Sequence, residues 1–281
     1  PVRLEFVFIL LLNFINQIVV GALGAVAVAS VGLVNSLNLI PTFTLGALGA
    51  SAAILVARAY GAKREKELNT VVSSALIAGF VISLVVAVPL ALIPAEILKA
   101  CGASADVLKD GPIYMAVLSL SLPFAVLAEI FSGILRSADH ARSPMLATII
   151  TTVLNTPIAI ILVFGWFGIP AMGIVGAAWA TLIICIIKAA VMAYQTYGLY
   201  RIAGWETPGS WVSWKLVLVP LFVLGIPLAL TTIFWTSGNF IYNIIAQQIS
   251  NDALAVLQIF GSLEAVFFVA SLGLMSAVTA L

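Results

Sequence analysis

Charged residues are scarce in this chain of 281 residues, because Asp, Glu, Lys and Arg together make up 8% of it. A soluble domain carries roughly 25% of such residues, which cover its water-facing surface. Hydrophobic residues reach 63% of the chain, and the mean hydropathy is +1.22. The composition therefore excludes a soluble globular protein and indicates a chain that lies mostly within a membrane.

Residues that build catalytic and metal sites are also scarce. His140 is the single histidine, and Cys101 and Cys185 are the two cysteines. We expect both thiols to be inert rather than paired or metal-bound. The sequence contains no H-E-x-x-H, no G-x-S-x-G and no paired intramembrane aspartates. These absences argue against an enzyme and against a bound cofactor, and a net charge of +1 gives no reason to expect a nucleic-acid partner.

Long apolar runs are what the sequence does contain. Four of them hold no charged residue: 6–57, 68–95, 143–187 and 216–251. A helix crosses the hydrocarbon layer with about 20 apolar residues, and these runs are continuously apolar rather than alternating. We therefore predict an all-α polytopic membrane protein. Its eight expected crossings are 4–23, 27–57, 69–93, 112–135, 144–167, 172–199, 216–247 and 252–281.

The loops between these crossings separate by charge. Basic residues gather on one side: Arg3, Arg58, Lys63, Arg64, Lys66, Arg136, Arg142, Arg201 and Lys215. The opposite side carries Lys99 and Lys109. Because cytoplasmic loops are enriched in Lys and Arg, we expect the N-terminus and the basic side to be cytoplasmic.

The chain also contains an internal repeat, since residues 1–55 align with residues 227–281 without a gap. The block NFIN, which starts at Asn13, aligns with NFIY, which starts at Asn239. Six predicted helices separate the two copies, so both copies enter the membrane in the same direction. Parallel repeats around a central site are a transporter architecture.

The repeat predicts two six-helix lobes, the second cut after its second helix. We expect an N-terminal lobe over 1–200, an inter-lobe linker over 201–215 and the start of a C-terminal lobe over 216–281. The chain is therefore expected to be part of a longer protein.

Four local patterns, in order along the chain, resemble the multidrug and toxic compound extrusion (MATE) family. They are INQIVVGALGAVAVASVG from Ile15, ILVARAYGAKREKE from Ile54, SGILRSADHARSPM from Ser132 and LNTPIAIILVFGWFGIPAMGIVGAAWAT from Leu154. The resemblance implies twelve helices in two lobes, of which four would lie beyond this chain. It also implies a monomeric antiporter of the bacterial inner membrane that exports small organic, often cationic, compounds in exchange for Na⁺ or H⁺.

The first predicted helix carries three amides on one face, Asn13, Asn16 and Gln17 at i, i+3 and i+4. An amide in hydrocarbon needs a partner, so this face should point into the bundle or a wet cavity. Interhelical hydrogen bonding is the competing explanation. The repeat places Asn239, Tyr242 and Asn243 on the matching face of the seventh helix, which favours a cavity lined from both lobes.

The fifth predicted helix carries a polar stripe that includes Thr151 and Asn155, and Thr181 follows in the sixth. The resemblance implies that Asn155 faces an aspartate that relatives carry where Asn16 stands here, and that this aspartate binds the coupling cation. Asn16 and Asn155 are therefore candidate Na⁺ ligands. An asparagine cannot titrate, so Asn16 itself cannot carry a proton.

Three further charged residues lie within or near predicted helices. Glu264 is near the middle of the eighth helix, where a carboxylate costs roughly 2.5–3.5 kcal/mol to insert, so it is a candidate for the substrate or cation cavity. Glu129 and Arg136 are two turns apart on the fourth helix and form either a gate or a structural pair.

Two other functions are also compatible with the sequence. One is a lipid-linked saccharide flippase of the same superfamily, which would need a basic cavity for pyrophosphate, whereas Lys188 is the one basic candidate on the expected cavity faces. The other is an uncoupled paralogue or a channel, because the acid expected at Asn16 is missing.

Overall fold

The computed structural model describes residues 19–249 apart from 102, 104, 169 and 207–210, and this part of the chain is helical. The helices are α2 (Ala25–Gly61), α3 (Glu65–Leu92), α4 (Pro94–Ala100), α5 (Val107–Ser119), α6 (Leu122–Ser137), α7 (Arg142–Phe164), η1 (Trp166–Gly168), α8 (Gly173–Tyr194), η2 (Gln195–Leu199) and α9 (Trp211–Ile249). Most of them are uncharged over long stretches, as the composition required.

Six spans of the described residues are long and apolar enough to cross a membrane. They are Val26–Gly61, Glu65–Leu92, Val107–Ser137, Arg142–Phe164, Gly173–Leu199 and Trp214–Gly238. They correspond to the second through seventh predicted crossings, which confirms a multi-pass membrane protein. The predicted crossing 252–281 lies outside the described residues, and of the predicted crossing 4–23 the structure describes residues 19–23 alone.

The predicted fourth crossing, 112–135, is not one continuous helix. It is divided between α5 and α6, with a turn at Leu120 and Ser121. Pro123 stands in the first turn of α6. Proline has no backbone N–H, so it cannot donate to the carbonyl of Ser119 four residues earlier, whereas it is well tolerated in the first turn of a helix. The helix therefore restarts at this position.

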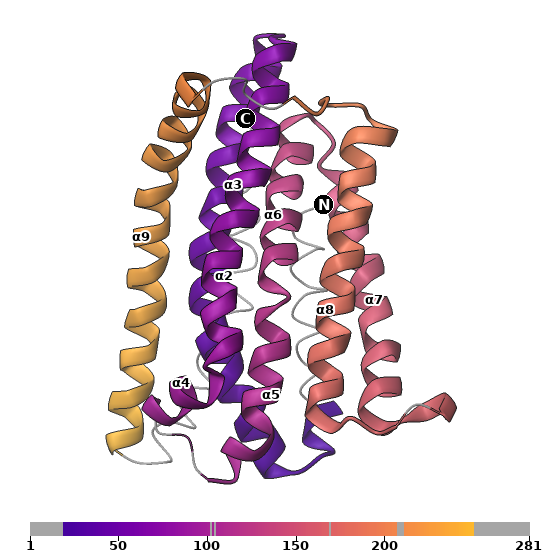
Figure 1. Cartoon of the computed structure of the whole chain (residues 1–281), viewed down its shortest axis with the longest axis vertical. Coiled ribbons are helices and arrows are strands. Elements are labelled where there is room, and N and C mark those ends of the chain that lie inside the picture. Colours follow the sequence, from indigo (N-terminus) through magenta and orange to yellow (C-terminus); the bar gives the residue numbers. More distant parts are fainter. Residues whose placement is uncertain (1–18, 102, 104, 169, 207–210, 250–281) are drawn as a thin grey trace.

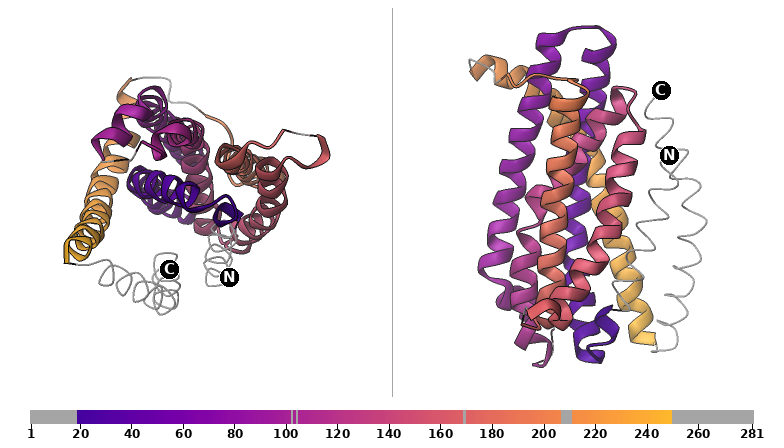
Figure 2. Two further views of the ribbon diagram at one scale, coloured as in Figure 1. Left: turned by 90° about the horizontal axis from the view of Figure 1, so that it is seen from below. Right: turned by 90° about the vertical axis from the view of Figure 1, so that its right-hand side faces the viewer.

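The helices form a bundle with α2 and α6 at its centre (Figure 1). On one side α9 packs against α2 and α3, and on the other side α8 packs against α6 and α7. The view along the bundle in Figure 2 shows α9 on the opposite side of α2 from α7 and α8. Glu129 of α6 and Lys188 of α8 are thereby placed on two helices that touch.

Glycines allow the central helices to approach closely. A Cβ added at Gly133 of α6 would lie 2.7 Å from the carbonyl oxygen of Gly49 in α2. Next to this contact the hydroxyl of Ser137 donates to the carbonyl of Ala53 at 2.9 Å. Small residues at such crossings let membrane helices gain van der Waals contact that larger side chains would prevent. The Gly49–Gly133 crossing therefore sets the distance between α2 and α6.

The segment 200–206, which follows η2, is held against the N-terminal helices. The Gly204 N–H donates to Asn69 Oδ1 of α3 at 2.7 Å, and the Glu206 N–H donates to Ser73 Oγ at 3.1 Å. Ile202 and Ala203 are buried in the cluster formed by α2, α3 and α6. The first part of the predicted linker is thus packed on the lobe that precedes it.

Replacing Asn69 by alanine is expected to loosen this segment, because the Gly204 N–H loses its acceptor. A hydrogen bond of this kind contributes about 0.5–1.5 kcal/mol, so local opening should rise several-fold. Trypsin cleavage after the exposed Arg201 measures that opening. Asn69→Asp keeps an acceptor oxygen and should cleave like the wild type; equal cleavage of Asn69→Ala would show that the bond does not hold the segment.

Candidate functional site

A cavity of about 100 Å³ lies between α2, α6 and α8, well inside the membrane-spanning part of the bundle. Its lining is largely apolar but includes a carboxylate, an ammonium, a hydroxyl and a thiol. The lining residues are Thr42, Ala125, Val126, Ala128, Glu129, Cys185 and Lys188.

The two charges of this cavity face each other. Lys188 Nζ lies 3.9 Å from Glu129 Oε1, at the outer limit of an ion pair. The Lys188 side chain is 19% exposed, whereas the Glu129 side chain is 49% exposed. A charge in the membrane interior is costly and is normally compensated by a partner, which Lys188 provides here. The more open carboxylate retains acceptor capacity towards the cavity.

Glu129 was expected to act with Arg136, two turns further along α6. Its ion pair in the structure is with Lys188 of the neighbouring helix α8. Lys188 follows Cys185 by one turn and ends the uncharged run 143–187. The position of Lys188 at the end of a long uncharged run was the one sign in the sequence that it pairs with an acid inside the bundle. The Glu129–Arg136 gate stays a prediction.

The polar stripe of α7 is buried, as expected for a face that points into the bundle. Thr151 and Asn155 are 3% and 4% exposed. The Asn155 Oδ1 atom is buried and has no hydrogen-bond partner within the described part of the chain. A buried carbonyl oxygen without a donor costs roughly 1–3 kcal/mol, so this atom is free to accept from a ligand or to coordinate a cation.

The predicted threonines bond to their own helices. Thr151 Oγ1 donates to the carbonyls of Ala147 at 2.8 Å and Thr148 at 3.1 Å. Thr181 Oγ1 donates to the carbonyl of Ala177 at 3.0 Å. Such bonds satisfy the hydroxyl hydrogen inside the helix. Each oxygen can still accept, but neither threonine can donate to a ligand without breaking its bond.

Thr151, Asn155 and Thr181 are not among the residues that line the Glu129–Lys188 cavity. Asn13, Asn16, Gln17 and Glu264 lie outside the described residues. Asn239, Tyr242 and Asn243 lie on α9, but their side chains are outside what the structure describes. The predicted cavity between the two lobes therefore stays a prediction, as does the Na⁺ site of Asn16 and Asn155.

The arrangement defines a class of protein: a multi-pass α-helical membrane protein with a charged cavity among its central helices. Within that class, the MatE family profile matches residues 1–161, more than half of the chain. The chain belongs to this family, as the four sequence patterns indicated.

Curated relatives of the chain are described as multidrug resistance proteins. The chain is 32% identical over 214 residues to a probable multidrug resistance protein, YoeA, of Bacillus subtilis, covering 75% of this chain and 46% of the relative. It is 28% identical over 260 residues to the probable multidrug resistance protein NorM of Thermotoga maritima, covering 91% of this chain and 54% of that protein. The chain thus spans about half the length of these relatives.

Solved structures share the fold. A crystal structure of a MATE protein in the bent conformation matches 100% of this chain and 62% of its own chain, with a TM-score of 0.88 at 22% identity. A MATE family transporter in an outward-facing conformation matches with a TM-score of 0.80, also at 22% identity, over 100% of this chain and 61% of its own. At this identity the likeness establishes the helix arrangement.

Proposed function

We propose that the full-length protein exports small organic, often cationic, compounds and that its two lobes alternate around a central cavity, driven by exchange for Na⁺ or H⁺. The observation that carries this proposal is the Glu129–Lys188 pair, which lines a cavity inside the membrane-spanning bundle. Ionisable residues within a membrane mark substrate or ion pathways. Membership of the MatE family and the multidrug resistance proteins among its relatives support the same function.

The cavity suits an organic cation because its carboxylate, Glu129, is more exposed than its ammonium, Lys188. A cationic compound can bind the half-exposed Glu129 carboxylate through a charge-assisted hydrogen bond. Lys188 balances that carboxylate while no substrate is bound. Substrate and Lys188 therefore compete for Glu129, which keeps the site from holding its substrate too tightly for release.

For the coupling ion we favour Na⁺ at a site that includes Asn155 and Asn16. The buried Oδ1 of Asn155, which has no donor among the described residues, offers a neutral oxygen ligand. An amide cannot titrate, so these two residues support a metal cation better than a proton. Glu264 is the proposed alternative carrier in the second lobe. The proposed cavity between the two lobes is completed by two polar faces. The face of the first lobe includes Asn13 and Gln17, and the face of the second lobe includes Asn239, Tyr242 and Asn243.

The proposed setting is the bacterial inner membrane, with the N-terminus in the cytoplasm and the protein acting as a monomer without a cofactor. The ends of helices that carry Arg58, Arg136 and Arg142 gather at one end of the bundle, in keeping with this orientation. The proposal is one of transport, with no catalytic step.

The test is substrate flux in vesicles that contain the full-length protein, under an imposed Na⁺ gradient or an imposed pH gradient. We expect wild-type flux to follow the Na⁺ gradient. Asn155→Ala should weaken the apparent Na⁺ affinity by about tenfold or more, as for other losses around a metal site. Glu67→Gln, which alters an exposed carboxylate away from the cavity, serves as the control and should leave the Na⁺ dependence unchanged.

Two results would overturn parts of this proposal. Flux that follows neither gradient would favour an uncoupled paralogue or channel. Flux that follows the pH gradient and is abolished by Glu264→Gln would move coupling to the second lobe.

The flippase alternative receives less support from the cavity. Lys188 does line it, but Glu129 neutralises that charge. A pyrophosphate group would have to displace the carboxylate and would then meet one cation. This lining is therefore better matched to a cationic compound than to a polyanionic lipid headgroup.

A further inference from the structure

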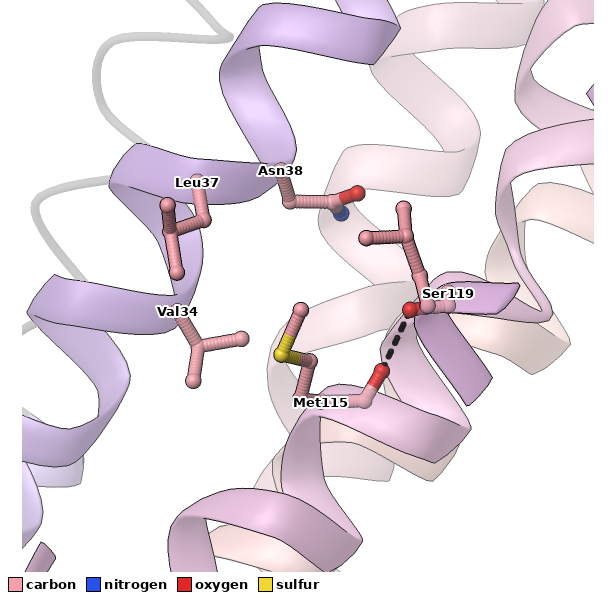
Figure 3. A pocket seen from close by; sticks show the side chains of 6 residues that line it. Val34, Leu37, Asn38, Met115 and Ser119 are labelled. Carbon is pink, nitrogen blue, oxygen red and sulfur yellow. Dashed lines mark hydrogen bonds between the residues drawn. The ribbon is translucent and has the colours of Figure 1, made fainter. Parts of the chain in front are cut away.

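A second, much smaller cavity lies where α2, α3 and α5 meet. Its volume is about 10 Å³, and its lining residues are Val34, Leu37, Asn38, Leu90, Met115 and Ser119. Figure 3 shows the amide of Asn38 extending from α2 towards Ser119 and Met115 of α5. The cavity is separate from the one that contains Glu129 and Lys188, with which it shares no lining residue.

Two hydrogen-bond acceptors belong to the side chains around this cavity. Asn38 Oδ1 is buried and has no hydrogen-bond partner among the residues that the structure describes. Ser119 Oγ donates its hydrogen to the carbonyl of Met115 at 2.6 Å, drawn as a dashed line in Figure 3, so its lone pairs can only accept. A molecule that satisfied both oxygens would have to be small and to donate two hydrogen bonds.

Prolines interrupt the backbone of the surrounding helices at the same place. Pro41 lies inside α2 and Pro123 in the first turn of α6, each four residues after a lining residue, Leu37 or Ser119. The carbonyls of those two lining residues therefore lack the N–H donor of a regular helix. In membranes, backbone groups freed by proline are commonly satisfied by neighbouring hydroxyls or by ordered water.

We propose that this cavity binds one ordered water molecule. A water molecule is small enough for this cavity and can donate two hydrogen bonds. A cavity of roughly 10–15 Å³ with two or more polar partners is sufficient to hold one water molecule. The water donates to Asn38 Oδ1 and to Ser119 Oγ, and so joins α2 to α5 beside the direct hydrogen bond from Tyr114 to Asn35 Oδ1, which measures 3.1 Å. It satisfies Asn38, which would otherwise be a buried acceptor without a donor.

Met115 provides the test, because its thioether lines the cavity although the residue is 3% exposed. X-ray radiolysis turns bound water into hydroxyl radicals. Such a radical attacks the sulfur of a neighbouring methionine, and dissolved O₂ completes the oxidation to the sulfoxide. Met192 is 0% exposed and does not line the cavity, so it is the matched buried control. In the full-length protein we expect Met115 to be oxidised several-fold faster than Met192, as measured by mass spectrometry.

The variant Asn38→Leu removes the acceptor with little change in side-chain size and should bring the oxidation rate of Met115 down to that of Met192. If Met115 in the wild type is oxidised no faster than Met192, the proposed water is absent. If the rate stays high in Asn38→Leu, the radicals come from elsewhere and the proposal fails. The wild-type comparison decides the question even if the variant does not fold.

Discussion

Replacing Gly133 by valine is expected to lower the thermal stability of the protein sharply. A Cβ at Gly133 would lie 2.7 Å from the Gly49 carbonyl oxygen and 3.2 Å from Ala53 Cβ. The nearest atom belongs to backbone, so α2 and α6 must separate. Overpacking of this kind costs about 1–3 kcal/mol and occasionally more, here at the centre of the bundle. Thermal unfolding of the purified full-length protein measures the loss.

The matched control is Gly46→Val, one turn before Gly49 on α2. Apart from its chain neighbours and the nearby backbone of α2 itself, no atom of the described residues lies within 4 Å of a Cβ built at Gly46. A side chain in place of glycine favours a helix interior by up to about 1 kcal/mol, so this control should be neutral or slightly stabilising. Equal stability of the two variants would mean that the Gly49–Gly133 contact does not set the helix spacing.

Replacing Glu129 by glutamine is expected to raise the apparent KM for a monovalent organic cation by about tenfold to a hundredfold. A hydrogen bond to a charged group contributes about 1.5–3 kcal/mol, and glutamine keeps the shape while losing the charge. Transport of an uncharged substrate should change little. The measurement is initial flux against substrate concentration, for one cationic and one uncharged compound.

Two further variants separate this role from a structural one. Lys188→Met removes the competing ammonium, so cation affinity should stay the same or rise, opposite to Glu129→Gln. Glu67→Gln alters an exposed carboxylate that pairs with Arg64 at 3.1 Å near the start of α3 and should leave both substrates unaffected. Equal losses for the cationic and the uncharged compound in Glu129→Gln would contradict a direct contact with substrate.

Sequence alone predicted the membrane class and the family, because both depend on composition and local order. Apolar runs of about 20 residues or more report helices directly. The break between α5 and α6 was missed although Pro123 was visible. Pro41 lies inside the continuous helix α2, whereas Pro123 marks the start of a new helix. The sequence does not distinguish these two cases, because the apolar run continues past both prolines.

The candidate site was predictable to a smaller extent. The buried face that contains Thr151 and Asn155 followed from helical spacing, and the structure buries both residues. The partner of Glu129 did not follow, because Lys188 lies 59 residues further along the chain on a different helix. Periodicity reports neighbours within one helix, whereas contact between two helices depends on how they pack.

The docking of segment 200–206 on α3 has a consequence for the reach of the second lobe. Glu206 is fixed to Ser73, and α9 begins at Trp211, five residues later. A fully extended chain covers at most about 3.6 Å per residue, so the start of α9 can lie no further than about 18 Å from Glu206. The first helix of the second lobe is thus on a short tether, which permits rotation about its start but forbids a large translation.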